Sequence, residues 1–474
     1  MIRGAVPKSV ADELRMPLLA GAVLAAGAFG VLSAYDAKLA VGAFGALIAL
    51  VAIVVRPKLV ACVLVMSIYP TTFSVGGLSV QRLGAAIAVI AVAAQLLREG
   101  VHLRNARLTL WIVAAYALYA LMSLAWTVSI PGTFTGLGSL SISFAYMVAF
   151  AVLVRDGQDL RNILWTLVVW SVLLGLWWIG SYLKGVSREF NPAGDSNFFA
   201  ALQAIALPLV LALAAHVRRR AVKIGLYAGV AVIAASVVST LSRGGIAVLL
   251  ITAIMIALIP HRYLFASGGQ KFGFFMVTAA GFILLAAVAA SDLGSRVQET
   301  LNDPNVANGR QDLALAALHG FHDHPILGLG IGAFPPSSYQ LLRTTPGVFL
   351  AVHQSCLTPG STIRSTGTYC TGIAAHNAYL ESLVELGIPG LVLFLGIVGI
   401  TAVSLVNAVR RALLVNDRFL VSVATAMLVG LIAFSLDSFS LSSETNRTFW
   451  MIVGITLALP ALIGPARLWA GAKT

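Results

Sequence analysis

Apolar residues fill most of the chain in long, continuous runs, and shorter polar segments separate these runs. A run of about 18 or more apolar residues is long enough to cross a bilayer as a helix. Because the runs do not alternate residue by residue, they predict helices and not the strands of a membrane barrel. The pattern therefore predicts an all-α polytopic membrane protein.

About fourteen membrane-spanning helices are predicted from these runs. They lie at roughly 17–35, 39–55, 58–75, 83–97, 108–128, 136–154, 162–183, 198–215, 222–241, 244–260, 272–291, 388–407, 419–436 and 448–465. The first two runs and the run that contains Pro70 are the weakest of the set. A topology of about twelve spans is therefore the alternative.

The polar segments divide the chain into three predicted parts. Residues 1–291 form the N-terminal membrane helices, residues 292–386 a single large external loop, and residues 387–474 the C-terminal membrane helices. The loop is long enough for a few short helices over the membrane, but too small and polar to fold as a separate enzyme domain. The chain shows no convincing internal repeat, which argues against transporter folds built from repeats.

Charge and composition are consistent with this topology. Hydrophobic residues make up 59% of the chain and charged residues 10%, which excludes a soluble globular protein of this length. Basic residues gather in linkers that fall on one side: Arg56 to Lys58, Arg98 to Arg107, Arg155 to Arg161, Arg218 to Lys223, Arg262 to Lys271, and Arg410 with Arg411. The positive-inside rule makes this side, and both termini, cytoplasmic. The net charge of +13 follows from the same bias, so no nucleic-acid partner is needed to explain it.

Two cysteines, Cys356 and Cys370, fall in the large external loop. In an oxidising periplasm they could form a disulfide that closes a loop of about fifteen residues and contributes about 3 kcal/mol. Two free thiols fit the sequence equally well.

The segment from His376 to Gly390 closes the long external loop. His376 and Asn377 begin a short amphipathic helix, Gly387 stops it, and a membrane span starts near Pro389. Neutral imidazole is suited to take a proton near pH 7, so His376 is the candidate for acid–base chemistry. The sequence leaves open whether His376 takes a proton or only holds a substrate in place. Glu381 and Glu385, one turn apart, are interpreted as a polar face of the helix.

Arginines on the external side depart from the positive-inside rule, so they are candidates for a functional role. Arg243 stands with almost no loop between two long apolar runs, where a charge must face the interior of the bundle or a wet cavity. Arg310 begins a helical pattern after Gly309, and a guanidinium beside exposed backbone N–H groups suits a diphosphate. Arg82 begins a span on the same face and is either a third such residue or a snorkelling anchor.

Other polar residues on the external side are secondary candidates for contacts with a substrate. They are Asn377, Arg188, Asn197 and Tyr379. Asp195 or Asn197 could instead cap the span that follows. Asp437 lies at the external end of the penultimate span, with Glu444 and Arg447 nearby in sequence. It could form a buried pair with an arginine or contact a substrate, and the structural role is favoured.

No metal or cofactor site is predicted. The cluster of His319, His322, Asp323 and His324 fits no strong zinc pattern. The glycines at 328, 330 and 332 are not a dinucleotide motif, because no strand precedes them; they predict a tight turn that lets a helix meet the membrane.

The chain resembles the bacterial O-antigen ligases. His376 and Asn377, nine residues, Gly387, two residues and Gly390 match their signature H-[N/S/Q]-x9-G-x2-[G/T/Y]. The stretch from Gly309 to Phe334 resembles the segment upstream of it in the wider ligase and polymerase superfamily, as do Ser242-Arg243-Gly244 and the loop that contains Asn197. The motifs occupy residues 190–390, and the similarity of topology extends over most of the chain.

This resemblance implies a fold similar to the GT-C glycosyltransferases, in the bacterial inner membrane, with an active site that faces the periplasm. The donor would be O-antigen polysaccharide on undecaprenyl diphosphate, and the acceptor a sugar hydroxyl of the lipid A–core. The reaction would be inverting and independent of metal. His376 would be the general base, and Arg243, Arg310 and Arg82 would bind the diphosphate, since guanidinium groups bind phosphate with two hydrogen bonds.

Three other functions compete with that of an O-antigen ligase. An O-antigen polymerase uses the same donor, but polymerases tend to carry two sizeable external loops, and here the segment from Lys184 to Asn197 is short. A protein O-oligosaccharyltransferase would usually have a longer C-terminal region. A polysaccharide or lipid transporter would show paired repeats and charges along a central path, whereas the polar residues gather at one face.

Overall fold

The computed structural model describes residues 56–69, 74–75, 78–100, 107–185, 195–288, 294, 298, 309–348, 372–442 and 444–463. The chain divides into two units, Met1–Leu59 and Val60–Thr474, and nearly all of the described residues belong to the second. The predicted spans 17–35 and 39–55 lie outside the described residues, as do Arg188, Cys356 and Cys370. The three-part division of the chain and the count of fourteen spans stay predictions.

Helices make up nearly all of the described structure. They are α3 (Lys58–Ile68), α4 (Val80–Glu99), α5 (Arg107–Met122), the 3₁₀ turn η1 (Ser123–Ala125), α6 (Ile130–Leu153), α7 (Gly157–Leu183), α8 (Ser196–His216), α9 (Arg220–Ser239), α10 (Arg243–Leu258), α11 (His261–Leu264), α12 (Gly268–Val288), α14 (Arg310–Asp323), α15 (Phe334–Thr344), α16 (Ala378–Leu414), α17 (Arg418–Asp437) and α18 (Arg447–Leu462). Two short antiparallel strands, β1 (Ser74–Val75) and β2 (Leu78–Ser79), lie between α3 and α4.

Eight helices in the described part of the chain are long and apolar enough to cross a membrane. These are α4, α5 with η1, α6, α7, α8, α9, α16 and α17; shorter apolar helices are α3, α10 and α18. The protein is therefore a multi-pass membrane protein with a helical fold. Most predicted spans agree with a helix to within a few residues, because continuous apolar runs mark buried or lipid-facing helices directly.

The predicted span 58–75 is wrong in its length. The helix α3 ends at Ile68, and β1 and β2 follow it. Pro70 supplies the reason, because proline disfavours helical backbone at the residue before it and cannot donate a backbone hydrogen bond.

Short polar side chains fix where many helices begin. Each of the following accepts a hydrogen bond from a backbone N–H in the first turn of its helix: Ser79 for α4, Ser129 for α6, Asp156 for α7, Asp195 for α8, Ser242 for α10, Asn377 for α16, Asp417 for α17 and Asn446 for α18. Such caps satisfy donors that the helix itself cannot use, so the polar breaks in the sequence set the helix starts.

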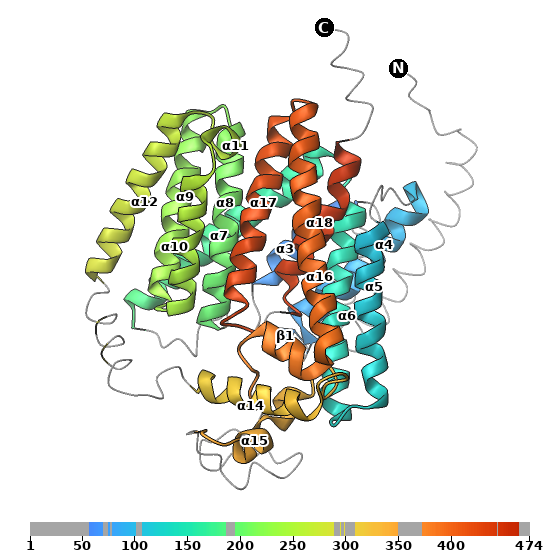
Figure 1. The fold of residues 1–474 in the computed structure, drawn as a ribbon. Helices are drawn as coiled ribbons and strands as arrows, with labels where there is room; N and C mark the ends of the chain where they lie inside the picture. The colour runs from blue at the N-terminus through green and yellow to red at the C-terminus, as the bar shows by residue number, and fades with distance from the viewer. Residues whose placement is uncertain are drawn as a thin grey trace, which may run out of the picture. The chain divides into compact units, whose positions relative to one another are not determined.

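The helix α8 lies in the interior of the bundle, and nearly all of its residues are buried. It packs against α7, α9, α10 and α17, while α16 lies between α17 and α5, and α6 packs against α4 and α18. Figure 1 shows the short helices α14 and α15 beyond one end of the long helices, next to the first turns of α16. This end of the bundle carries the predicted site.

The helix α16 breaks at Gly387, where φ is 64° and ψ is −167°. A Cβ atom at Gly387 would collide with the carbonyl oxygen of Ile326, so only glycine fits this position. The turn from Gly328 to Gly332 lies against the break, with hydrogen bonds from Leu329 N to Val384 O (2.9 Å) and from Gly330 N to Glu385 O (2.8 Å). The predicted helix stop at Gly387 and the predicted tight turn are both confirmed.

Candidate functional site

Arg243 is the first residue of α10, and its neighbours join three helices. Ser242 Oγ accepts a hydrogen bond from Gly245 N (3.1 Å) and donates one to Asn197 Oδ1 (2.7 Å), which links α10 to the first turn of α8. A Cβ atom at Gly245 would collide with Ala200 of α8, and one at Gly244 would lie 2.9 Å from Ser440 Oγ, just after α17. The two glycines therefore let the start of α10 approach α8 and the end of α17 closely.

Arg310 is the first residue of α14, and Gly309 precedes it in a left-handed conformation with φ of 69°. Its side chain is half-buried, and burial lowers the pKa of its guanidinium. The positive charge of Arg243 lowers the same pKa further, while the charges of Asp195 and Asp437 raise it. Two cations and two carboxylates from four separate segments thus act on one another at this end of the bundle.

His376 lies directly before the cap of α16, with a positive φ of 50°. Such a backbone conformation is uncommon for a residue with a side chain, and surrounding structure must hold it. Ala378 N donates to Ser438 O (2.8 Å) and Leu441 O (3.0 Å), which fixes the start of α16 against the end of α17.

The imidazole of His376 is electrostatically coupled to the arginine site. Burial of the half-buried ring lowers its pKa, the charge of Arg310 lowers it further, and the charge of Asp195 raises it. The lowered pKa favours neutral imidazole, the form that can accept a proton. Arg310 therefore acts on both of the other predicted residues, His376 and Arg243, through its charge.

The two carboxylates have different local roles. Asp195 caps α8, accepting hydrogen bonds from Asn197 N (2.8 Å) and Phe198 N (3.0 Å), so the cap predicted for Asp195 or Asn197 is Asp195. Asp437 ends α17 with 2% of its surface exposed, and its carbonyl oxygen accepts a hydrogen bond from Ser440 N (2.7 Å). The sequence favours a structural role for Asp437, and in the structure its charge also acts on Arg310. The sequence signal for this second role was the position of a charged residue at the end of an apolar run.

The other predicted substrate contacts are placed as follows. Asn377 Oδ1 accepts hydrogen bonds from Tyr379 N and Leu380 N, both at 3.0 Å, and thereby caps α16. The hydroxyl of Tyr379 donates to Ser435 O (2.7 Å), and its ring packs against Phe439. Arg82 is exposed near the start of α4, and among the described residues its charge is not one of those that shift the pKa of Arg310 or His376.

Glu381 and Glu385 are not a solvated polar face, so that interpretation is wrong. They are 5% and 3% exposed. Glu385 accepts hydrogen bonds from Gly332 N (2.7 Å) and Phe334 N (3.1 Å), and Glu381 accepts one from Ala375 N (3.3 Å). Helical spacing alone cannot separate an exposed polar face from a buried one that meets a neighbouring loop.

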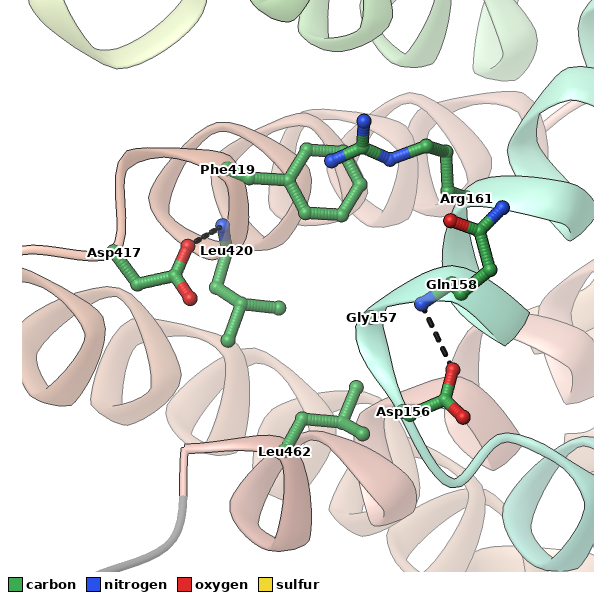
Figure 2. A pocket seen from close by; sticks show the side chains of 8 residues that line it. All are labelled: Asp156, Gly157, Gln158, Arg161, Asp417, Phe419, Leu420 and Leu462. Carbon is green, nitrogen blue, oxygen red and sulfur yellow. Dashed lines mark hydrogen bonds between the residues drawn. The ribbon is translucent and has the colours of Figure 1, made fainter. Parts of the chain in front are cut away.

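A pocket of about 390 Å³ lies at the start of α17, at the end of this helix that is far from Asp437. Figure 2 shows Arg161 over the ring of Phe419, with Asp156 and Asp417 at the starts of α7 and α17. Asp417 precedes α17 and Asp437 ends it, which separates the pocket from the His376 region by about 30 Å at 1.5 Å per residue. The pocket is therefore distinct from the site that contains His376.

Part of the chain is similar to a known family. Residues 228–358 match the family model described as O-antigen ligase. The matched range includes Arg243 and Arg310 together with α14 and α15, and His376 follows it in the sequence. No curated protein matches the chain. The segment that is similar to O-antigen ligases thus contains both arginines of the candidate site.

Proposed function

We propose that the protein transfers O-antigen polysaccharide from undecaprenyl diphosphate to a sugar hydroxyl of the lipid A–core. The observation that carries this proposal is the placement of His376 just before α16, of Arg310 at the start of α14 and of Arg243 at the start of α10. The charge of Arg310 acts on His376, and the charge of Arg243 acts on Arg310. The similarity of residues 228–358 to the O-antigen ligase family supports the class of substrate. A site at the end of membrane helices suits a reaction between two lipid-anchored molecules, because the membrane holds both reacting ends at one height.

In the proposed reaction, the acceptor hydroxyl oxygen attacks the anomeric carbon of the donor sugar from the face opposite the diphosphate. The new carbon–oxygen bond forms as the bond from the anomeric carbon to the phosphate oxygen breaks, which inverts the anomeric centre. The electron pair of that bond leaves with the diphosphate. His376 takes the hydroxyl proton, since a sugar hydroxyl is a poor nucleophile until its proton is removed.

Arg243 and Arg310 bind the diphosphate and stabilise the negative charge that grows on it as it leaves. Guanidinium remains charged at physiological pH and forms two parallel hydrogen bonds to phosphate oxygens. Two adjacent cations repel each other in the free protein, and this is why Arg243 lowers the pKa of Arg310. A bound dianion would relieve that repulsion, so the pair favours a substrate with at least two negative charges.

The proposed location is the bacterial inner membrane, with the His376 end facing the periplasm and both termini in the cytoplasm. Lipid-linked O-antigen and lipid A–core would both reach the site from the outer leaflet. The reaction as proposed requires no metal or cofactor, because the two arginines supply the positive charge that a divalent cation provides in many glycosyltransferases.

Reconstitution tests the proposal. Purified protein in liposomes is given undecaprenyl-diphosphate glycan and lipid A–core, and the joined product is measured by gel mobility and mass spectrometry. We expect His376→Ala to lower the rate by about a hundredfold or more. Arg243→Met and Arg310→Met should each lower it by about a hundredfold. The matched controls are His322→Ala and Arg343→Met, because both residues are exposed and lie on α14 and α15.

Several results would contradict parts of the proposal. Full activity of His376→Ala would show that His376 is not the general base. Products extended only on the lipid-linked glycan would identify a polymerase, and no product with any acceptor would favour transport. Loss of activity in EDTA, restored by a divalent cation, would show that the two arginines are not sufficient for the leaving group.

A further inference from the structure

Two glutamates lie buried beside the candidate site without being part of it. Glu381 and Glu385 are one turn apart in the first part of α16, before the break at Gly387. Burying a carboxylate costs several kcal/mol unless hydrogen-bond donors replace the water it loses. The donors around each carboxylate therefore indicate what each glutamate does.

Glu385 joins α16 to the segment between α14 and α15. Its two carboxylate oxygens accept hydrogen bonds from Gly332 N (2.7 Å) and Phe334 N (3.1 Å). Phe334 is the first residue of α15, so the carboxylate also faces the positive end of that helix. Since the turn before Gly332 follows directly from α14, Glu385 anchors the segment that holds the helix of Arg310 in place.

Glu381 joins α16 to the segment that contains His376. One of its carboxylate oxygens accepts a hydrogen bond from Ala375 N (3.3 Å), and Ser442 Oγ donates to the same oxygen. Ala375 directly precedes His376, whose φ of 50° requires support from its neighbours. With Ala378 N bound to Ser438 O and Leu441 O, the backbone is held on both sides of His376.

We infer that Glu381 and Glu385 are positioning residues that hold the His376 segment and the α14–α15 segment at fixed places against one helix. Each acts through the backbone N–H groups it accepts from, and neither touches the substrate. This inference rests on the proposed function for its effect on catalysis, but the anchoring itself does not. The anchoring requires an acceptor oxygen at the distance from the backbone that the glutamate side chain provides. Glutamine should therefore preserve the anchoring at either position, and methionine should abolish it.

Hydrogen exchange measured by mass spectrometry tests the anchoring without reference to activity. In Glu381→Met, amide exchange should rise about tenfold in the peptide that contains Ala375, and stay unchanged in the peptide that contains Gly332 and Phe334. Glu385→Met should give the reverse pattern. The two variants are matched controls for each other, because both remove a buried carboxylate from the same face of α16. Glu381→Gln and Glu385→Gln should exchange as the wild type does.

Turnover tests the consequence for catalysis. We expect each methionine variant to lower kcat about tenfold, and each glutamine variant to stay within about threefold of the wild type. If a methionine variant does not fold, the aspartate variant is measured instead. Aspartate keeps the carboxylate, but its shorter side chain moves the acceptor oxygen away from the backbone N–H.

The outcomes separate the inference from the proposed function. Unchanged exchange at Ala375 in Glu381→Met or Glu381→Asp would overturn the anchoring, as would equal loss of kcat in the glutamine and methionine variants. A wild-type protein that joins no lipid-linked glycan to any acceptor would overturn the proposed function, while the exchange pattern would still decide the anchoring.

Discussion

At the scale of residues, the charges around His376 oppose one another. Burial lowers the pKa of the imidazole, the charge of Arg310 lowers it further, and the charge of Asp195 raises it. A lowered pKa keeps the ring neutral to a pH below the ordinary histidine value of about 6.5. Below that pH the ring becomes protonated and can no longer take a proton. The acid side of the pH–rate profile therefore reports the balance of these two charges.

Removing the charge of Asp195 should move the acid side of the profile to lower pH. Asp195→Asn keeps a good helix cap for α8, because asparagine caps helices about as well as aspartate. It removes the charge that raises the pKa of His376, so that pKa falls and the neutral base persists at lower pH. The measurement is kcat against pH for both proteins in liposomes.

Asp156→Asn is the matched control for this shift. Asp156 caps α7 at the other end of the bundle, where Figure 2 shows it beside Gln158. The same chemical change there should leave the profile where it is. A shift of the Asp195→Asn profile to higher pH, or an equal shift in both variants, would contradict the electrostatic account.

At the scale of elements, the sequence predicts helices well where their limits are local. Apolar runs mark most spans, and the cap of α8 and the stop at Gly387 lie where polar residues and glycine interrupt the pattern. The end of α3 at Ile68 was missed, since the apolar run in the sequence continues past Pro70. Local chemistry thus gives helix positions, and errors arise where hydrophobicity and backbone preference disagree.

Contacts between distant elements were predictable only in part. The arginines and His376 were assigned to one face by topology, but the charge of Asp437 on Arg310 depends on how α17 packs beside α10 and α16. The burial of Glu381 and Glu385 depends on the turn from Gly328 to Gly332. Such neighbours come from tertiary packing, which the period of a single helix does not contain.

The break in α16 should be sensitive to a single methyl group. Gly387→Ala would force a side chain into a positive-φ conformation that glycine alone adopts readily, and bring its Cβ against the carbonyl oxygen of Ile326. The conformation alone costs about 1–3 kcal/mol, and the collision adds to it. We expect a clear fall in melting temperature in detergent, together with loss of turnover, because the break also anchors the glycine turn.

Gly399 provides the comparison on the same helix. It has normal helical geometry, and a Cβ there would meet nothing within 4 Å. Alanine is favoured over glycine within a helix by about 1 kcal/mol, so Gly399→Ala should melt at the same temperature as the wild type or higher. Equal melting temperatures for the two variants would show that Gly387 is not required at the break.

At the scale of the whole molecule, the two ends of the bundle differ in charge. The end that contains Asp417 carries a dense set of basic residues in its linkers: Arg155, Arg161, Arg218, Arg219, Arg220, Arg410, Arg411 and Arg418. Contacts of His216 with Ser422 and of Arg161 with Phe419 place these linkers at one end. The other end holds Arg243 and Arg310 together with Asp195 and Asp437. The positive-inside rule predicts that the denser basic end faces the cytoplasm.

This orientation can be measured by labelling single cysteines. In a background where Cys62, Cys356 and Cys370 are serine, Gln340→Cys places an exposed thiol on α15, and Ala266→Cys places one in the linker between α11 and α12. We expect a membrane-impermeant maleimide to label the first variant in intact spheroplasts, and the second only after lysis. Because transfer between lipid-linked substrates on the outer leaflet requires the His376 end outside, the reverse labelling pattern would contradict both the charge-based topology and the proposed function.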